Sequence, residues 1–362
     1  AAAGILSALI AATGVASVTA AGNLTVGGTA TNLSTSSGGT TTFGATTLTG
    51  GLTTTAVGDI TQTGAITTGT PSSITSSTGD ITLTNPGNSF FGATTLSGVD
   101  VSVAAAGSLN ALIAATGEAS ATAAGNLTVA GTANNLTTTS GGTTSFGVTT
   151  LTGALTTTSV GDITQTGAIT TGAPSSITSS TGDIDLSNAG NSLFGATSLS
   201  GVDVAIAAAG NLNALIAATG NASASASGNL MVAGTANNLA TISGGTTTFG
   251  ATTLTGGLTR ANHVNPSTAG TITSSLSSDP TVLAAEIISL RAQLALAVFT
   301  PPATTGRHQT PTTRGYCWTH GSSSNVLYTS ASCNTPAATW QSNRCHESQS
   351  DGWQLAPTRL PT

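Results

Sequence analysis

Cysteine and histidine residues gather near the carboxy-terminal end of the chain, where they could bind a metal ion. The candidate ligands are Cys317, His320, Cys333 and Cys345, with His346 beside the last cysteine. Thiolates and imidazoles together can form a tetrahedral zinc site. However, the pattern Cys-x2-His followed by gaps of 12 and 11 residues matches no zinc-binding signature. One disulfide with a spare thiol, or no ordered site, is therefore the favoured alternative, and we predict no cofactor.

Aspartates that follow glycine recur at regular places and offer carboxylate chemistry. Asp59 and Asp80 occupy equivalent places one repeat unit apart, and Asp162 and Asp183 repeat this pair. Two carboxylates about 5 to 9.5 Å apart can hydrolyse glycosides, and stacked aspartates could bind calcium. Yet an Asp after Gly also satisfies a turn, residues 1–259 hold no Lys, Arg or His, and the Gly-Gly-x-Gly-x-Asp calcium motif is absent. We predict that the protein is not an enzyme, with a polysaccharide-acting enzyme as the third alternative.

Threonine-rich runs could supply a binding surface made of hydroxyl groups. Such runs occur at Thr46-Thr47, Thr53–Thr55, Thr61-x-Thr63 and Thr67-Thr68. Regular Thr-x-Thr rows on stacked strands would form flat hydroxyl ladders, which resemble ice-binding surfaces. The alternative is that outward strand positions favour Thr for its β propensity. We expect the variable spacing of the repeats to spoil a regular lattice.

A 103-residue repeat organises most of the chain and must position these groups. The blocks are 1–103, 104–206 and the partial block 207–259, and the first two differ at 20 of 103 positions without a gap. Within a block, the token Gly-(Asn/Asp/Ser)-(Leu/Ile) recurs at intervals that fit units of 18 to 21 residues, five to a block. A repeat of this length indicates a solenoid array and not a globular enzyme domain.

The units have the pattern of short strands. Val99, Val101 and Val103 alternate with Asp100 and Ser102, which is typical of half-buried strands. The fold class we predict is all-β: a right-handed parallel β-helix of about 20-residue coils. Inward apolar rows should stack from coil to coil, with Thr and Ser facing outward. The predicted core residues are Phe43, Phe91, Phe146, Phe194, Phe249, Ile60, Ile81, Ile163 and Ile184.

Four runs in the array carry a resemblance to a known group of proteins. They are Gly58–Gln62 and Gly161–Gln165, both Gly-Asp-Ile-Thr-Gln, with Gly22–Val26 and Gly125–Val129, both Gly-Asn-Leu-Thr-Val. The pattern resembles the repeat regions of filamentous-haemagglutinin-like exoproteins of two-partner secretion and of autotransporter passengers. This resemblance implies a bacterial adhesin or filament, secreted or held on the outer cell surface.

The composition changes abruptly at Arg260, where the array ends and different segments begin. Residues 260–278 are predicted to be a transition. Asp279-Pro280 should start an α-helix over 279–299, which caps the array or joins chains, and Pro301-Pro302 ends it. Residues 300–362 are rich in Thr, Ser and Pro, and we expect an irregular tail or a frameshifted end.

The charge of residues 1–259 limits the classes of molecule that the array could bind. Residues 1–259 contain eight acids and no base, so neither nucleic acid nor an anionic membrane is an expected partner. We expect self-association into a fibre or longer rod, and host-surface or biofilm glycans as ligands. Because residue 1 lies inside the repeat, we expect a fragment or mature product of a longer protein. The predicted function is a structural adhesin or filament segment, and the alternative is a Thr-ladder surface that binds ice or glycan.

Overall fold

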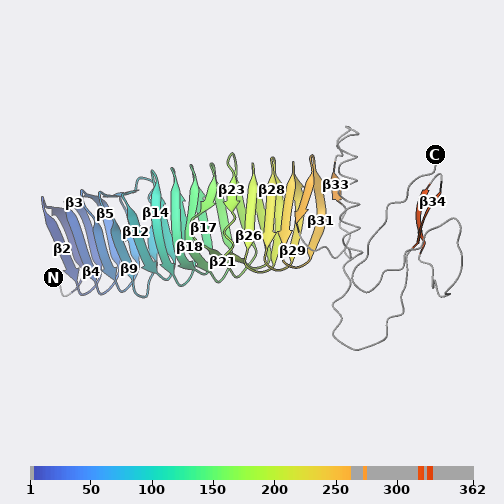
Figure 1. The fold of residues 1–362 in the computed structure, drawn as a ribbon. Helices are drawn as coiled ribbons and strands as arrows, with labels where there is room; N and C mark the ends of the chain where they lie inside the picture. The colour runs from blue at the N-terminus through green and yellow to red at the C-terminus, as the bar shows by residue number, and fades with distance from the viewer. Residues whose placement is uncertain (1–3, 262–271, 275–316, 322–323, 329–362) are drawn as a thin grey trace, which may run out of the picture. The chain divides into compact units, whose positions relative to one another are not determined.

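The computed structural model describes residues 4–261, 272–274, 317–321 and 324–328. The chain forms two compact units, Ala1–Ile287 and Ile288–Thr362. In the first unit, about 14 coils stack along one axis (Figure 1), and each ordinary coil contributes one strand to each of two parallel sheets. The predicted all-β parallel β-solenoid is therefore confirmed. The described residues contain no helix, and hence none that could cross a membrane.

All strands of the solenoid run parallel to their neighbours, as expected when the chain returns by one full coil before it pairs again. The 17-stranded sheet contains β1 (Leu6–Ala11), β3 (Leu24–Ala30), β5 (Thr41–Leu48), β7 (Ile60–Gln62), β8 (Ile66–Thr68), β10 (Ile81–Leu83), β11 (Ser89–Phe90), β13 (Val101–Ala105), β15 (Ala119–Ala123), β17 (Leu136–Ser140), β19 (Leu155–Ser159), β22 (Ser175–Ser179), β25 (Ala196–Gly201), β27 (Leu212–Ala218), β29 (Leu230–Ala236), β31 (Thr247–Leu254) and β33 (Ile272–Ser274).

The 16-stranded sheet contains β2 (Val15–Ala20), β4 (Asn32–Ser37), β6 (Leu52–Ala56), β9 (Ser72–Ser76), β12 (Ala93–Gly98), β14 (Leu109–Ala115), β16 (Leu127–Ala133), β18 (Thr144–Leu151), β20 (Ile163–Gln165), β21 (Ile169–Thr171), β23 (Ile184–Leu186), β24 (Ser192–Leu193), β26 (Val204–Ala208), β28 (Ala222–Ala226), β30 (Leu239–Ser243) and β32 (Leu258–Ala261). The inner faces of the two sheets share one continuous hydrophobic core.

The core is not purely apolar, which corrects the expectation that Thr and Ser face outward. Buried hydroxyls pair between neighbouring coils: Thr35 Oγ1 donates to Thr54 Oγ1 over 3.1 Å, and Thr138 repeats this bond with Thr157. A hydroxyl can both donate and accept, so a stacked row of them can satisfy its own polar groups. Among the described residues, the buried hydroxyls of Thr94 and its equivalent Thr197 are exceptions without a hydrogen-bond partner.

Coil length varies, but the strands stay in register. The offset between paired residues ranges from 17, between Val15 and Asn32, to 22, between Ser72 and Thr94. Most extra residues lie outside the ladders, and one in each block lies inside, at the bulge of β5, β18 or β31. The strand faces are therefore regular although the sequence spacing is not.

The 103-residue block spans five and a half coils, not five. Starting at Thr41 in β5, the 17-stranded ladder passes through Ile60, Ile81, Val101, Ala119 and Leu136. The residue equivalent to Thr41 is Thr144, which follows half a coil later in β18 of the other sheet. Equivalent residues of the two full blocks therefore lie on opposite faces of the solenoid.

A glycine permits a bulge within one strand pair of each block. Gly28, Gly131 and Gly234 have φ angles of 116°, 126° and 123°, a region that side chains with Cβ rarely adopt. A Cβ at Gly131 would also collide with the backbone carbonyl oxygen of Ile113 on the preceding coil. The register shifts beside each of these glycines.

The last coils extend the array beyond residue 259. β32 pairs with β30, and β33 pairs with β31, inside the predicted transition 260–278. The Arg260 guanidinium lies 4.9 Å from the centre of the Phe249 ring, and partial burial lowers the pKa of Arg260. The predicted helix 279–299 lies outside the described residues. β34 (Cys317–Gly321) and β35 (Ser324–Tyr328) form an antiparallel hairpin, so the prediction of an irregular tail is wrong for these residues.

Candidate functional site

Two columns of hydroxyls cover five neighbouring strands of the 16-stranded sheet. On β6, the outward residues Thr53 and Thr55 pair with Ser73 and Thr75 of β9, and the same alignment continues to β2, β4 and β12. We call this surface grid 1; its ten hydroxyl residues are Ser17, Thr19, Ser34, Ser36, Thr53, Thr55, Ser73, Thr75, Thr95 and Ser97. All ten are exposed or partly exposed.

The half-coil offset places a second copy of this surface on the 17-stranded sheet. β19 carries Thr156 and Thr158, which pair with Thr137 and Thr139 of β17. We call this surface grid 2; its ten residues are Ser120, Thr122, Thr137, Thr139, Thr156, Thr158, Ser176, Thr178, Ser198 and Ser200. Each is 103 residues after its counterpart in grid 1, so the two grids face opposite directions.

The grids are regular because β-sheet geometry sets their spacing. Strands lie about 4.8 Å apart, and alternate residues along one strand are roughly 6.6 Å apart. Thr53 and Thr55 belong to grid 1, whereas Thr46, Thr54 and Thr68 of the predicted rows are buried. The expectation that variable spacing spoils the lattice is wrong, because the corners absorb the variation.

The face opposite each grid is mixed. Opposite grid 1, Leu9 and Ala45 are exposed, and opposite grid 2 their equivalents Leu112 and Val148 are exposed. No acidic residue lies on a grid strand. Each full block therefore presents one neutral hydroxyl face and one mixed face.

Carboxylates form a ladder at one corner of the solenoid. The backbone N–H of Asp80 donates to Asp59 Oδ1 over 3.0 Å, that of Asp100 to Asp80 Oδ1 over 3.1 Å, and that of Glu118 to Asp100 Oδ1 over 2.7 Å. The predicted placement of Asp59 and Asp80 on adjacent coils is confirmed. Each of these carboxylates caps a turn at the corner by accepting a backbone hydrogen bond from the next coil.

The second block repeats the ladder at the opposite corner. Asp183 N donates to Asp162 Oδ1 over 2.9 Å, and Asp203 N donates to Asp183 Oδ1 over 3.0 Å. The backbone N–H of Asn221 then donates to Asp203 Oδ1 over 2.6 Å. Asn221 takes the place of Glu118, and its Oδ1 accepts a hydrogen bond from Asn238 Nδ2 as Glu118 Oε1 does from Asn135 Nδ2. A carboxylate and an amide therefore fill the same role at this position. Across the described part of the chain, no three His, Cys, Asp or Glu side chains cluster as a metal site would require.

The metal-ligand candidates are only partly within the structure. Cys317 and His320 both lie on β34, where they pair in register with Tyr328 and Asn325 of β35. Cys333, Cys345 and His346 lie outside the described residues, so neither the zinc candidate nor the favoured disulfide alternative is tested.

Most predicted core residues point inward, with two exceptions. Phe43, Phe146, Phe249, Ile60, Ile81, Ile163 and Ile184 are buried. The prediction is wrong for Phe91 and Phe194, which are 68% and 66% exposed. The strands β11 and β24 place Phe90 and Leu193 inward instead, and alternation then turns the next residue out.

A hydrogen-bonded pair of amide side chains, buried Asn88 and partly buried Gln62, was not foreseen from the sequence. The Asn88 and Gln62 side chains exchange two hydrogen bonds of 2.8 Å, and Asn88 Oδ1 also accepts from the backbone N–H of Ile66. Asn88 Nδ2 further donates to the carbonyl oxygens of Leu83 and Ala104. Asn191 and Gln165 repeat the pair in the second block. The signal was present in the repeated Gly-Asp-Ile-Thr-Gln run, where Gln is unusual in a strand of Thr.

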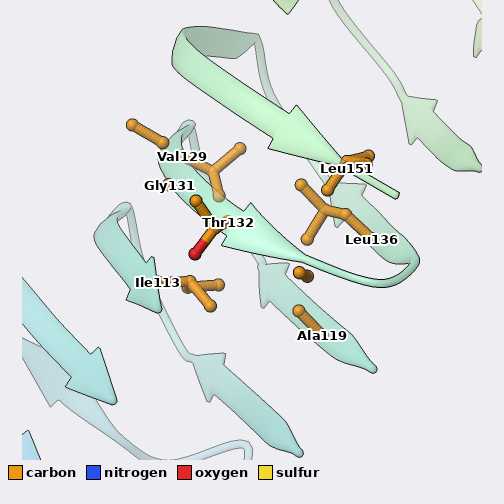
Figure 2. Close-up of a pocket in the computed structure, with 9 residues that line it drawn as sticks. Ile113, Ala119, Val129, Gly131, Thr132, Leu136 and Leu151 are labelled. Carbon is orange, nitrogen blue, oxygen red and sulfur yellow. The ribbon is translucent and has the colours of Figure 1, made fainter. Parts of the chain in front are cut away.

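The cavities found in the described residues are too small to hold a substrate. One cavity of about 10 Å³ lies beside the bulge at Gly131, lined by Ile113, Val129, Leu136 and Leu151 (Figure 2). An equivalent cavity of about 10 Å³ lies beside Gly234. Each is roughly the size of a single water probe.

Comparisons with known proteins agree with a repeat architecture. A family model described as repeats of unknown function (DUF5649) matches residues 30–97 and 133–200. These ranges are the same part of the two full blocks, and they run from β4 to β12 and from β17 to β25. A search of curated proteins and a search of solved structures found no match. The chain is a repeat protein with a parallel β-helix fold, similar over these ranges to that repeat family.

Proposed function

We propose that residues 1–259 form a non-enzymatic, structural segment of a bacterial adhesin or filament that lies outside the cell. The observation that carries this proposal is the unbroken parallel ladder from β1 to β31 around one continuous core. A stack in which each coil contacts only its neighbours provides length and surface, which are the properties such a segment needs.

The composition of the surface supports a role outside the cell. The backbone ladders and stacked apolar rows hold the array together without ion pairs, since residues 1–259 contain no Lys, Arg or His. Charge screening by salt acts on ion pairs and leaves this kind of cohesion largely intact. An array of this kind should keep its structure over a wide range of ionic strength.

Assembly of the purified chain tests the filament proposal. We expect electron microscopy and light scattering to show thin rods that associate end to end. Leu9 is 90% exposed on β1. The bonds donated by Leu6 N and Ala12 N to the next coil imply that alternate donors, including Leu9 N, point away from it. Leu9→Pro should therefore remove an edge donor and reduce association while leaving the circular dichroism spectrum unchanged. Monodisperse particles without filaments at high concentration would contradict the filament proposal.

A second candidate is an ice-binding surface, which the ten-hydroxyl grids favour. We expect wild-type protein to slow ice recrystallisation if this function holds, and the variant Thr55→Lys/Thr158→Lys to lose the effect. Thr47→Lys/Thr150→Lys is the matched control, because both residues are exposed on strands outside the two grids. Equal activity in all three proteins would contradict ice binding by the grids.

A further inference from the structure

We propose that the two grids bind the flat surfaces of two separate fibres of a neutral, extended β-linked polysaccharide, so that one chain bridges them. This inference rests on the proposed extracellular role and names its ligand. The observation behind it is the half-coil offset, which gives one molecule two copies of one surface facing in opposite directions.

Comparison of the two full blocks shows that the grid chemistry is kept while other outward positions change. Three of the ten grid positions differ between blocks, as in Ser34 and Thr137, and each exchange retains a hydroxyl. Outward positions elsewhere change in character: Thr82 corresponds to Asp185, and Val15 to Glu118. The property common to both grids is therefore a neutral surface of hydroxyl groups.

The chemistry of the grids favours a neutral polysaccharide. Hydroxyls donate and accept hydrogen bonds, so they match sugar hydroxyls in either orientation. No cation lies in residues 1–259 to attract an acidic polysaccharide, and the corner carboxylates would repel one. Trp and Tyr are absent from the array, so ring stacking on sugars is not available there.

The geometry favours the flat side of a fibre over a single chain in solution. Each grid lies on the outer face of a parallel sheet, and no grid residue lines either of the two cavities found in the described residues. Two strand spacings, about 9.6 Å, are comparable with two sugar residues of an extended β-linked chain. Each grid alone should bind weakly, and many parallel contacts on a fibre should provide the avidity.

Binding and bundling of crystalline cellulose and of chitin by the full chain test this proposal. The single-grid variants are Thr53→Lys/Thr55→Lys and its equivalent Thr156→Lys/Thr158→Lys, which raise long charged side chains from the centre of one grid. The matched control is Thr47→Lys/Thr150→Lys, at exposed strand positions outside both grids. Circular dichroism and resistance to a broad-specificity protease verify that each variant is folded.

We expect wild type and control to sediment with at least one of the two fibres and to bundle it, as seen by turbidity and microscopy. Each single-grid variant should still bind but not bundle, and the variant with all four grid substitutions should lose about tenfold or more of its binding. Bundling by either single-grid variant, equal loss in the control, or no binding by wild type would overturn the proposal. Rods that form without any polysaccharide binding would refute the bridging and leave the structural role intact.

Discussion

Replacing Phe146 by Ala tests the inward stacking on which the solenoid depends. Phe146 is fully buried in β18, paired with Val129 on one neighbouring coil and Gln165 on the other. A buried Phe removes roughly 150–250 Å² from water, which at about 25 cal/mol per Å² corresponds to roughly 4–6 kcal/mol. Ala still buries part of this apolar area, and the surrounding side chains relax around the smaller residue. We therefore expect Phe146→Ala to lower the free energy of unfolding by about 3–5 kcal/mol.

Phe194→Ala is the matched control, because the same residue type in the same block is 66% exposed. Its loss should be about 1 kcal/mol, since only a third of the ring area is buried. The assay is guanidinium unfolding followed by circular dichroism. Long repeat arrays need not unfold in two states, so the comparison is made between the midpoints of the two variants. Equal midpoints for Phe146→Ala and Phe194→Ala would refute the facing assignment in the structure.

Four further predictions follow from other features. Gly131→Ala should lower stability by about 1–3 kcal/mol or more because of its positive φ, whereas Gly107→Ala, where a Cβ meets nothing within 4 Å, should be near neutral; thermal unfolding compares them. Asn88→Ala should cost about 3 kcal/mol in guanidinium unfolding, because it leaves several buried partners unpaired. Asp100→Asn should keep the corner bond and relieve repulsion between stacked acids, so it should be at least as stable as wild type, and Asp100→Ala less stable. Trypsin should leave a large fragment because no site precedes Arg260, and rapid loss of that fragment to a broad-specificity protease would contradict a folded array.

The sequence was sufficient for the fold class because two signals agreed. Period-two alternation predicted strands, and the repeat predicted that they stack. Phe43 and Ile60 followed from this pattern, since both lie in strands whose alternation is clear. Phe91 did not, although it begins the same Phe-Gly-Ala-Thr-Thr-Leu token as Phe43. The bulge in β5 adds one outward residue, so Phe43 and Leu48 both face inward despite their odd separation. No such bulge accompanies Phe91, which alternation turns outward.

The grids could be predicted only in part. Thr53 and Thr55 were recognised as outward candidates, but their alignment over five strands depends on corners that absorb the variation in coil length. The opposite placement of the grids depends on whether 103 residues make a whole or half-integral number of coils. Repeat length alone does not decide that, because coils of 17 to 22 residues allow either count.

The half-coil offset is the central claim, and distances between paired spin labels test it most directly. Thr55 and Thr150 share one outward column, through Thr75, Ser97, Ala114 and Thr132, which is five strand spacings or about 24 Å. Thr158 is the equivalent of Thr55 one block later and lies on the other sheet.

The measurement uses the cysteine pairs Thr55→Cys/Thr150→Cys and Thr55→Cys/Thr158→Cys in a chain whose three native cysteines are replaced by serine. Electron paramagnetic resonance should give a distance for the first pair near the column value. The distance for the second pair should be several ångströms longer, because five and a half strand spacings, about 26 Å along the solenoid, combine at right angles with about 10 Å between the sheets. The outward reach of the two labels on opposite faces lengthens it further. A second distance equal to or shorter than the first would show that each block makes a whole number of coils and would contradict the account.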